Sequence, residues 1–178
     1  MKKINLPLEE SQIEALKAGE EVLLSGYIYT ARDKTHLRLM KDFDLRKKPA
    51  GSKKIPLDLK GQIVYYTGPT PASPGRVIGS CGPTTSGRMD AFAEPLLRYG
   101  VKAMIGKGRR SEEVRQAIKK YKAVYFLTVA GAGAYLSKRV IEAQPVLYKD
   151  LGAEALYRLK VKDFPVIVAI DSRGNSIY

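Results

Sequence analysis

The stretch VKAMIGKGRRSEEVRQAIKKYKAVYFLTVAG (residues 101–131) decides the fold class, because it passes from strand to helix and back to strand. Residues 111–121 predict an amphipathic helix that begins at Ser111 as its cap and ends in lysines. Residues 123–131 form a continuous apolar run, which is typical of a buried strand, and residues 101–108 predict a short strand with a glycine turn. Two strands joined by a helix favour parallel pairing.

The same alternation continues outward along the chain. Helices or helical turns are expected at 11–19 (with Ser11 as a cap), 32–48, 86–100, 132–143 and early in 154–178. Strands are expected at 21–31, 62–68 and 76–82, with a closing hairpin around Ser172, Arg173, Gly174 and Asn175. Residues 49–61 read as a loop because prolines and glycines interrupt them. The pattern predicts an α/β fold whose sheet is at least partly parallel.

The chain has 178 residues, a formal net charge of +13 and one cysteine. This length suits one domain, so we expect residues 1–178 to fold as a single unit. One cysteine excludes a disulfide framework, a zinc site of several thiolates and an iron–sulfur cluster carried by this chain alone. Because no apolar run predicts a membrane span or a signal peptide, we expect a cytoplasmic protein. The charge indicates an anionic partner or, equally, a lysine-rich surface that favours solubility.

The segment CGPTTSGRMD (81–90) places three hydroxyl groups in a glycine- and proline-containing turn between a predicted strand and a predicted helix. Ligands of open α/β sheets bind at the carboxyl ends of strands, and the free N–H groups of a helix start attract anions. Arg88 adds a guanidinium that suits a carboxylate. We therefore predict an anion site. The alternative is an ordinary capped helix start, in which threonine and serine serve as N-cap and turn residues and Ser86 is a possible cap. The glycine and lysine spacing of a P-loop is absent.

Two further cations occupy equivalent places in the predicted fold. Arg32 follows the first strand of the pattern, and Lys107 follows another strand between two glycines. Together with Arg88 they predict a crevice for a small dianion, although each taken singly is more typical of surface charge. The lone His36 is typical of a structural residue, with orientation of Arg32 one helical turn away as the alternative. Cys81 is typical of a small buried residue rather than a nucleophile.

The net charge of +13 also suggests a second hypothesis, a non-catalytic module that binds anions or nucleic acid. Basic residues cluster within 41–54 and 102–122, yet exposed aromatic residues that could stack on bases are not interleaved with them. The aromatic residues of the predicted strands are expected in the core instead: Tyr65, Tyr66, Tyr125 and Phe126.

Three segments carry a resemblance to a known family: YTARDKTH (29–36), GPTTSGRMD (82–90) and IGKG (105–108). In that order they resemble the β subunit of the class I, iron–sulfur-dependent fumarate hydratases and L(+)-tartrate dehydratases, which is also the carboxy-terminal domain of the single-chain members. The resemblance covers nearly the whole chain. It implies a swivelling β/β/α fold with a mixed, partly parallel sheet. It also implies reversible hydration of fumarate to L-malate, or dehydration of L-tartrate.

The resemblance also implies roles for particular residues. Arg32 and Lys107 are similar to residues that bind substrate carboxylates, and Arg88 is similar to the arginine at the reacting centre. Thr84 resembles a base or proton shuttle, which Thr85 supports. The family further implies a separate α subunit, whose cysteines hold a four-iron, four-sulfur cluster, and a C4 dicarboxylate substrate. The expected assembly is a hetero-oligomer with two copies of each subunit, and neither nucleic acid nor membrane is expected as a partner.

Overall fold

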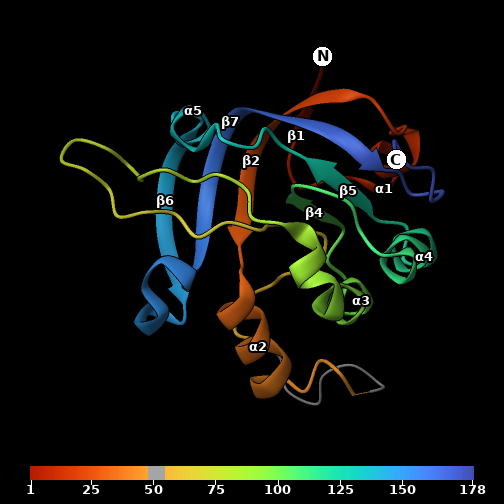
Figure 1. The fold of residues 1–178 in the computed structure, drawn as a ribbon, viewed down its shortest axis with the longest axis horizontal. Coiled ribbons are helices and arrows are strands. Elements are labelled where there is room, and N and C mark those ends of the chain that lie inside the picture. The colour runs from red at the N-terminus through yellow and green to blue at the C-terminus, as the bar shows by residue number, and fades with distance from the viewer. Residues whose placement is uncertain (48–54) are drawn as a thin grey trace.

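A mixed sheet forms the centre of the molecule. The computed structural model describes residues 1–47 and 55–178, and the strands of these residues are β1 (Lys2–Asn5), β2 (Glu21–Thr30), β3 (Ile63–Tyr65), β4 (Ala103–Gly106), β5 (Val124–Leu127), β6 (Val140–Leu147) and β7 (Leu156–Ile170). Their spatial order is β1-β2-β3-β4-β5-β7-β6, with a further pairing of β2 and β7. The pairings from β2 through β3, β4, β5 and β7 therefore return to β2 and close the sheet (Figure 1).

Strand direction divides the sheet into two parts. β1 and β3 pair with β2 in parallel, and β3, β4 and β5 continue in parallel. β7 runs antiparallel to β2, β5 and β6. The strand is long because both of its edges are paired: one edge follows β2, and the other follows β6 and then β5. The expectation of a partly parallel sheet is confirmed.

Three of the helices of the described residues cover one face of this sheet, while Ile13 and Leu136 of the other two belong to the core enclosed by the strands. The helices of the described residues are α1 (Glu10–Ala15), α2 (Asp33–Asp42), α3 (Asp90–Tyr99), α4 (Glu112–Lys120) and α5 (Gly133–Ser137), with 3-10 turns η1 (Ser86–Met89) and η2 (Lys149–Glu154). Figure 1 shows α2, α3 and α4 grouped on one side of the strands. Their apolar faces share one core with the outward residues of β3, β4 and β5.

The two faces of the central strands belong to two different cores. Ile63 and Tyr65 of β3 pack into a core enclosed by the strands, whereas Val64 faces the helices. In β4, Ile105 points inward and Met104 outward in the same way. Successive side chains of a strand point to opposite faces, so a strand buried on both faces requires a continuous apolar run. This explains why the central strands are visible in the sequence as unbroken apolar stretches.

Several predicted elements are confirmed in position. The strands expected at 21–31, 62–68, 101–108 and 123–131 correspond to β2, β3, β4 and β5. The Ser111 hydroxyl accepts a hydrogen bond from the Val114 N–H at the start of α4, as predicted for its cap. Gly100 ends α3 in the left-handed conformation at φ 119°, which glycine adopts without strain. The helix expected over 32–48 ends at Asp42. The predicted loop 49–61 lies partly outside the described residues, which resume at Ile55.

Two predicted elements are wrong. Residues 76–82 form no strand but belong to an arm that projects from the fold (Figure 1). Pro69, Pro71 and Pro74 precede them in the same arm. The two halves of the arm bond at Thr70, which donates to the Ser80 carbonyl and accepts from the Gly79 N–H, but the flanking prolines have no N–H to continue such a ladder. The helix expected early in 154–178 is instead β7, because its alternating residues pair on both edges. The turn near Ser172 is confirmed, as Ile170 pairs antiparallel with Ser176.

The helix starts were also placed differently from the prediction. Ser11 lies inside α1, whose cap residue is Glu9. Ser86 lies inside the 3-10 turn that precedes α3, and its buried hydroxyl contacts Tyr125 rather than a helix N–H. Ser86 is therefore not the predicted cap, and Thr85 occupies the cap position of the 3-10 turn without a side-chain hydrogen bond to it. Strand β1 was not predicted from the sequence, because its four residues carry only one buried side chain, Ile4.

Candidate active site

Three neighbouring parallel strands end at one edge of the sheet, and the predicted site residues follow them. Arg32 lies two residues beyond β2, and Lys107 directly follows β4. The chain after β3 leaves as the arm and returns at Thr84, whose N–H donates to the Tyr66 carbonyl over 2.7 Å. Ligands of α/β sheets bind at this kind of edge, so the topology supports the predicted crevice.

Backbone hydrogen bonds attach the threonine segment to the end of β4. The Lys107 N–H donates to the Thr84 carbonyl over 3.3 Å, and the Ser86 N–H donates to the Lys107 carbonyl over 2.9 Å. Thr85 forms a parallel bridge with Lys107. Thr84 and Lys107 are half-buried, whereas Thr85 is exposed. The structure thus brings Thr84, Thr85 and Lys107 together on one short ladder.

A single carboxylate joins the two predicted arginines. The Arg88 Nη2 atom donates to Asp33 Oδ1 over 2.9 Å, and Arg32 Nε lies 3.7 Å from Asp33 Oδ2. The side chain of Arg88 is 53% exposed, while those of Arg32 and Asp33 are 27% and 29% exposed. The guanidinium groups of Arg32, which follows β2, and of Arg88, which lies in η1, therefore meet at the start of α2, and both side chains are partly exposed.

The Arg32 side chain is held by close backbone contacts. A Cβ atom at Gly68 would lie 3.0 Å from Arg32 Cδ and 3.1 Å from the Ala153 carbonyl oxygen. The His36 ring donates from Nδ1 to the Arg32 carbonyl over 2.7 Å and stacks on Phe92 with centroids 5.2 Å apart. Burial lowers the pKa of His36 to about 4, so the ring is neutral at pH 7. His36 is therefore a buried, neutral residue, and its bond to the Arg32 carbonyl also agrees with the alternative that it orients Arg32.

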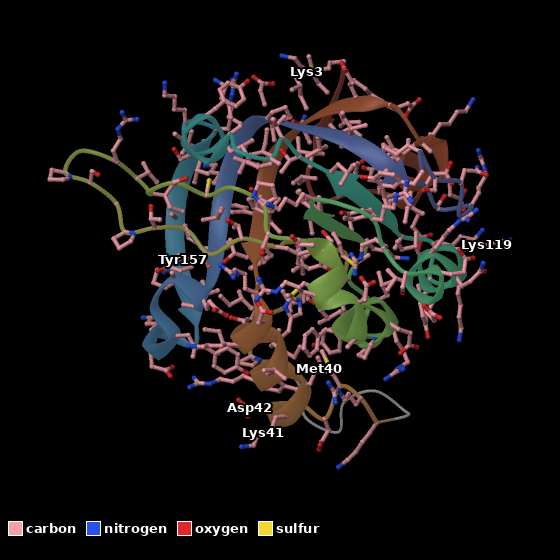
Figure 2. All side chains as sticks on the ribbon, viewed as in Figure 1. Lys3, Met40, Lys41, Asp42, Lys119 and Tyr157 are labelled. Carbon is pink, nitrogen blue, oxygen red and sulfur yellow. The ribbon has the colours of Figure 1, made fainter. Side chains whose placement is uncertain are left out.

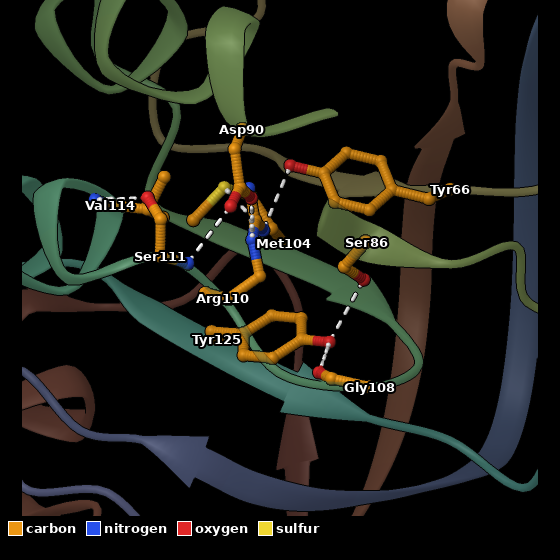
Figure 3. Close-up of polar contacts among 9 residues, drawn as sticks. All are labelled: Tyr66, Ser86, Asp90, Met104, Gly108, Arg110, Ser111, Val114 and Tyr125. Carbon is orange, nitrogen blue, oxygen red and sulfur yellow. Dashed lines mark hydrogen bonds and ion pairs between the residues drawn. The ribbon is translucent and has the colours of Figure 1, made fainter. Parts of the chain in front are cut away.

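A buried network of polar contacts joins Asp90 to Arg110 and Ser86 to Tyr125 (Figure 3). The Arg110 side chain is 0% exposed, and its Nε donates to Asp90 Oδ1 over 2.6 Å. Its guanidinium lies 5.3 Å from the Tyr66 ring centroid and 5.1 Å from that of Tyr125. The Tyr125 hydroxyl is 2.8 Å from Ser86 Oγ and also donates to the Gly108 carbonyl. These contacts fix Ser86 and Asp90, which flank Arg88 in the chain.

The chain offers little to hold a metal. Cys81 is its sole cysteine, and it is fully buried. Burial raises the pKa of the Cys81 thiol to about 12, so the thiolate that a metal requires is disfavoured. Among residues 1–47 and 55–178, no group of three or more histidine, cysteine, aspartate or glutamate residues is placed to bind an ion. The expectation that Cys81 is a small buried residue is confirmed.

The remaining positive charge is spread over the surface. Lys3, Lys41 and Lys119 are exposed and point outward on three separate sides of the molecule (Figure 2). The aromatic residues that were expected in the core are 0% exposed: Tyr65, Tyr66, Tyr125 and Phe126. These rings cannot stack on bases, so the structure removes support from a nucleic-acid platform. No helix of the described residues is long and apolar enough to span a membrane.

Sequence reasoning missed two parts of this site. Asp33 was not among the predicted site residues, whereas it joins Arg32 to Arg88. Arg110 lies within the basic cluster 102–122 and was not singled out, although its guanidinium is buried. The GPTTSGRMD motif contains its partner Asp90, but an acidic residue at a helix start is also expected from the helix dipole, so it does not by itself point to a buried cation.

Comparison with protein families shows to which family this chain belongs. A family model described as "Fumarase C-terminus" matches residues 1–178. The chain belongs to this family. A protein of Methanocaldococcus jannaschii, provisionally named L(+)-tartrate dehydratase subunit beta, is 37% identical over 177 residues, which cover 96% of this chain and 88% of that protein.

Other members of the fumarase C-terminus family are much longer. The aerobic class I fumarate hydratase of Escherichia coli is 32% identical over 98% of this chain and 32% of its own length. Fumarate hydratase 1 of Leishmania major is 35% identical over 100% of this chain and 32% of its own length. This chain therefore spans about a third of the fumarate hydratases that it matches. The resemblance drawn from the three motifs is confirmed.

Proposed function

We propose that the chain is the β subunit of an iron–sulfur-dependent hydro-lyase that hydrates fumarate to L-malate reversibly or dehydrates L-tartrate. The observation that carries this proposal is the meeting of Arg32 and Arg88 on Asp33, at the sheet edge where Thr84 and Lys107 also lie. A cationic edge of this kind suits a small dicarboxylate. The names of the tartrate dehydratase and fumarate hydratase relatives support the same reaction class.

The proposed roles follow from the chemistry of dehydration. The reaction removes a proton from the carbon beside a carboxylate and a hydroxyl group from the next carbon. Negative charge then spreads into that carboxylate, and preorganised cations stabilise it. Arg32 and Lys107 bind the carboxylates, and Arg88 faces the reacting centre. Thr84 moves the proton with support from Thr85, and cationic neighbours such as Arg88 favour the ionised hydroxyl that this role requires.

The proposed cluster does not fit this chain. Four-iron, four-sulfur clusters require several thiolates, and Cys81 is single, buried and held as a thiol. We therefore assign the cluster to a partner α subunit. The proposed partners are that subunit and a C4 dicarboxylate, in a hetero-oligomer with two copies of each subunit. Nucleic acid and membrane are not among them.

We also propose an architecture and a cellular location for the chain. Residues 1–178 form one domain of the swivelling β/β/α type, and the closed pairing of strands with helices on one face supports this assignment. We propose a cytoplasmic location.

Assembly with a cluster-bearing α subunit tests the function. Anaerobic co-expression of both chains is expected to give fumarate hydration or tartrate dehydration that neither chain shows alone. Full activity from this chain without iron would contradict the proposal. The second hypothesis predicts a different result: tight nucleic-acid binding with a steep salt dependence that survives both Arg88→Ala and Thr84→Ala.

Substitution of Gly68 tests the binding role of Arg32. A methyl group in Gly68→Ala meets the fixed Ala153 carbonyl on one side, so the Arg32 side chain must yield on the other. We expect KM for the dicarboxylate to rise several-fold with a smaller change in kcat, because a displaced guanidinium weakens binding in ground and transition states alike. Steady-state kinetics of the assembled enzyme measure both constants. An unchanged KM in a variant of normal melting temperature would remove Arg32 from substrate binding.

A further inference from the structure

We propose that Asp33 is a positioning residue that orients Arg88 for the reaction. The inference rests on the proposed function and adds a residue to it. Asp33 is the first residue of α2, and α2 begins where β2 ends, so the carboxylate is anchored to the rigid sheet. Arg88 lies in a short 3-10 turn and its side chain is 53% exposed. A long exposed side chain has many rotamers, and one fixed partner removes most of them.

The contacts of Arg88 show how it can be held and still act. Among the described residues its guanidinium donates one hydrogen bond, from Nη2 to Asp33 Oδ1 at 2.9 Å. A guanidinium carries five N–H donors, so the other donors stay free to face a ligand. The bond to a carboxylate is charge-assisted and directional, which fixes the plane of the guanidinium. Asp33 thus holds Arg88 by one end.

The second oxygen of Asp33 is left without a hydrogen bond. Asp33 Oδ2 and Arg32 Nε are both buried atoms that lack a hydrogen-bond partner, and they face each other across 3.7 Å. Buried polar atoms normally find partners, so the unsatisfied Arg32 Nε donor is available to a bound carboxylate. The Arg32 Nε donor can turn to a bound carboxylate while Asp33 keeps Arg88 in place.

Two opposite effects separate this role from a structural one. Because Asp33 is an anion beside an anion-binding edge, it repels a dicarboxylate as well as orienting Arg88. Removing the carboxylate should therefore lower turnover while leaving binding of an unreactive dicarboxylate unchanged or tighter. Damage to the fold would weaken turnover and binding together.

The test compares Asp33→Ala and Asp33→Asn in the assembled holoenzyme. We expect Asp33→Ala to lower kcat on the order of 10- to 100-fold, the effect of losing one charge-assisted hydrogen bond. The inhibition constant of succinate, which cannot be dehydrated, stays equal or falls. Asp33→Asn gives an intermediate kcat, because its amide oxygen still accepts from Arg88. The matched control is Asp150→Ala. It removes the carboxylate that pairs at 2.6 Å with Arg38, which lies on α2 as Asp33 does, and it should change neither kcat nor the inhibition constant.

Two results would overturn the role of Asp33. One is a kcat of Asp33→Ala within twofold of wild type. The other is a loss of succinate affinity in proportion to the loss of kcat. If the wild-type assembly has neither hydratase nor dehydratase activity, the proposed function fails on its own. The positioning claim is then judged by a crystal structure of the Asp33→Ala assembly, where an Arg88 side chain in its original place contradicts it.

Discussion

Arg88→Ala is expected to lower turnover of the assembled enzyme on the order of 10³-fold, with little effect on folding. Turnover and folding are affected differently because the Arg88 side chain lies at the surface of the proposed site and not in the core. Arg88 is half-exposed, and its ion pair with Asp33 is of the partly exposed kind that contributes about 0–1 kcal/mol to stability. Its proposed work is in the transition state, where charge moves into the carboxylate beside the carbon that loses its proton.

Kinetics and thermal melting of the same preparation check this prediction. The control is Arg38→Ala, because Arg38 also forms one ion pair from the surface, with Asp150 at 2.6 Å, and is 39% exposed. Arg38→Ala should keep both activity and melting temperature. Arg88→Lys should recover part of the turnover, since lysine restores the charge without the planar fork. Turnover within twofold of wild type in Arg88→Ala would exclude Arg88 from the mechanism.

Residues whose environment is local were predicted correctly from the sequence. The strands β3, β4 and β5 are buried on both faces, so their apolar runs are continuous and visible without tertiary knowledge. The cap of α4 depends on Ser111 and an N–H three residues away. The wrong elements depend on distant partners. β7 was taken for a helix because its charged residues mask an alternation that only pairing with β2 and β6 explains.

The same division applies to the candidate site. Arg32, Arg88 and Lys107 could be grouped from the sequence because each follows a predicted strand, and parallel strands end at a common edge. The link through Asp33 could not, since it joins residues 55 positions apart by a side-chain geometry that no periodicity encodes. Arg110 was missed for a related reason: a basic run of the sequence does not show which of its members turns inward.

Arg110→Met is expected to destabilise the chain more than any surface substitution, by about 3–5 kcal/mol in the free energy of unfolding. The Arg110 side chain is 0% exposed, and its removal leaves the Asp90 carboxylate without its cation. The stacking of the guanidinium between the rings of Tyr66 and Tyr125 is lost as well. For a chain of this length the melting temperature should fall by roughly 10 °C.

Denaturant unfolding of a small set of variants separates the ion pair from simple loss of packing. Arg110→Met with Asp90→Asn should be less destabilised than the sum of the two single variants, because the double variant leaves no uncompensated buried charge. Arg38→Met is the surface control and should change stability by less than about 1 kcal/mol. Strict additivity of the two buried substitutions would show that Arg110 and Asp90 act independently. In that case the segment from Ser86 to Asp90 must be held by its other contacts, which are the backbone bonds to Lys107 and the bond of Ser86 to the Tyr125 hydroxyl.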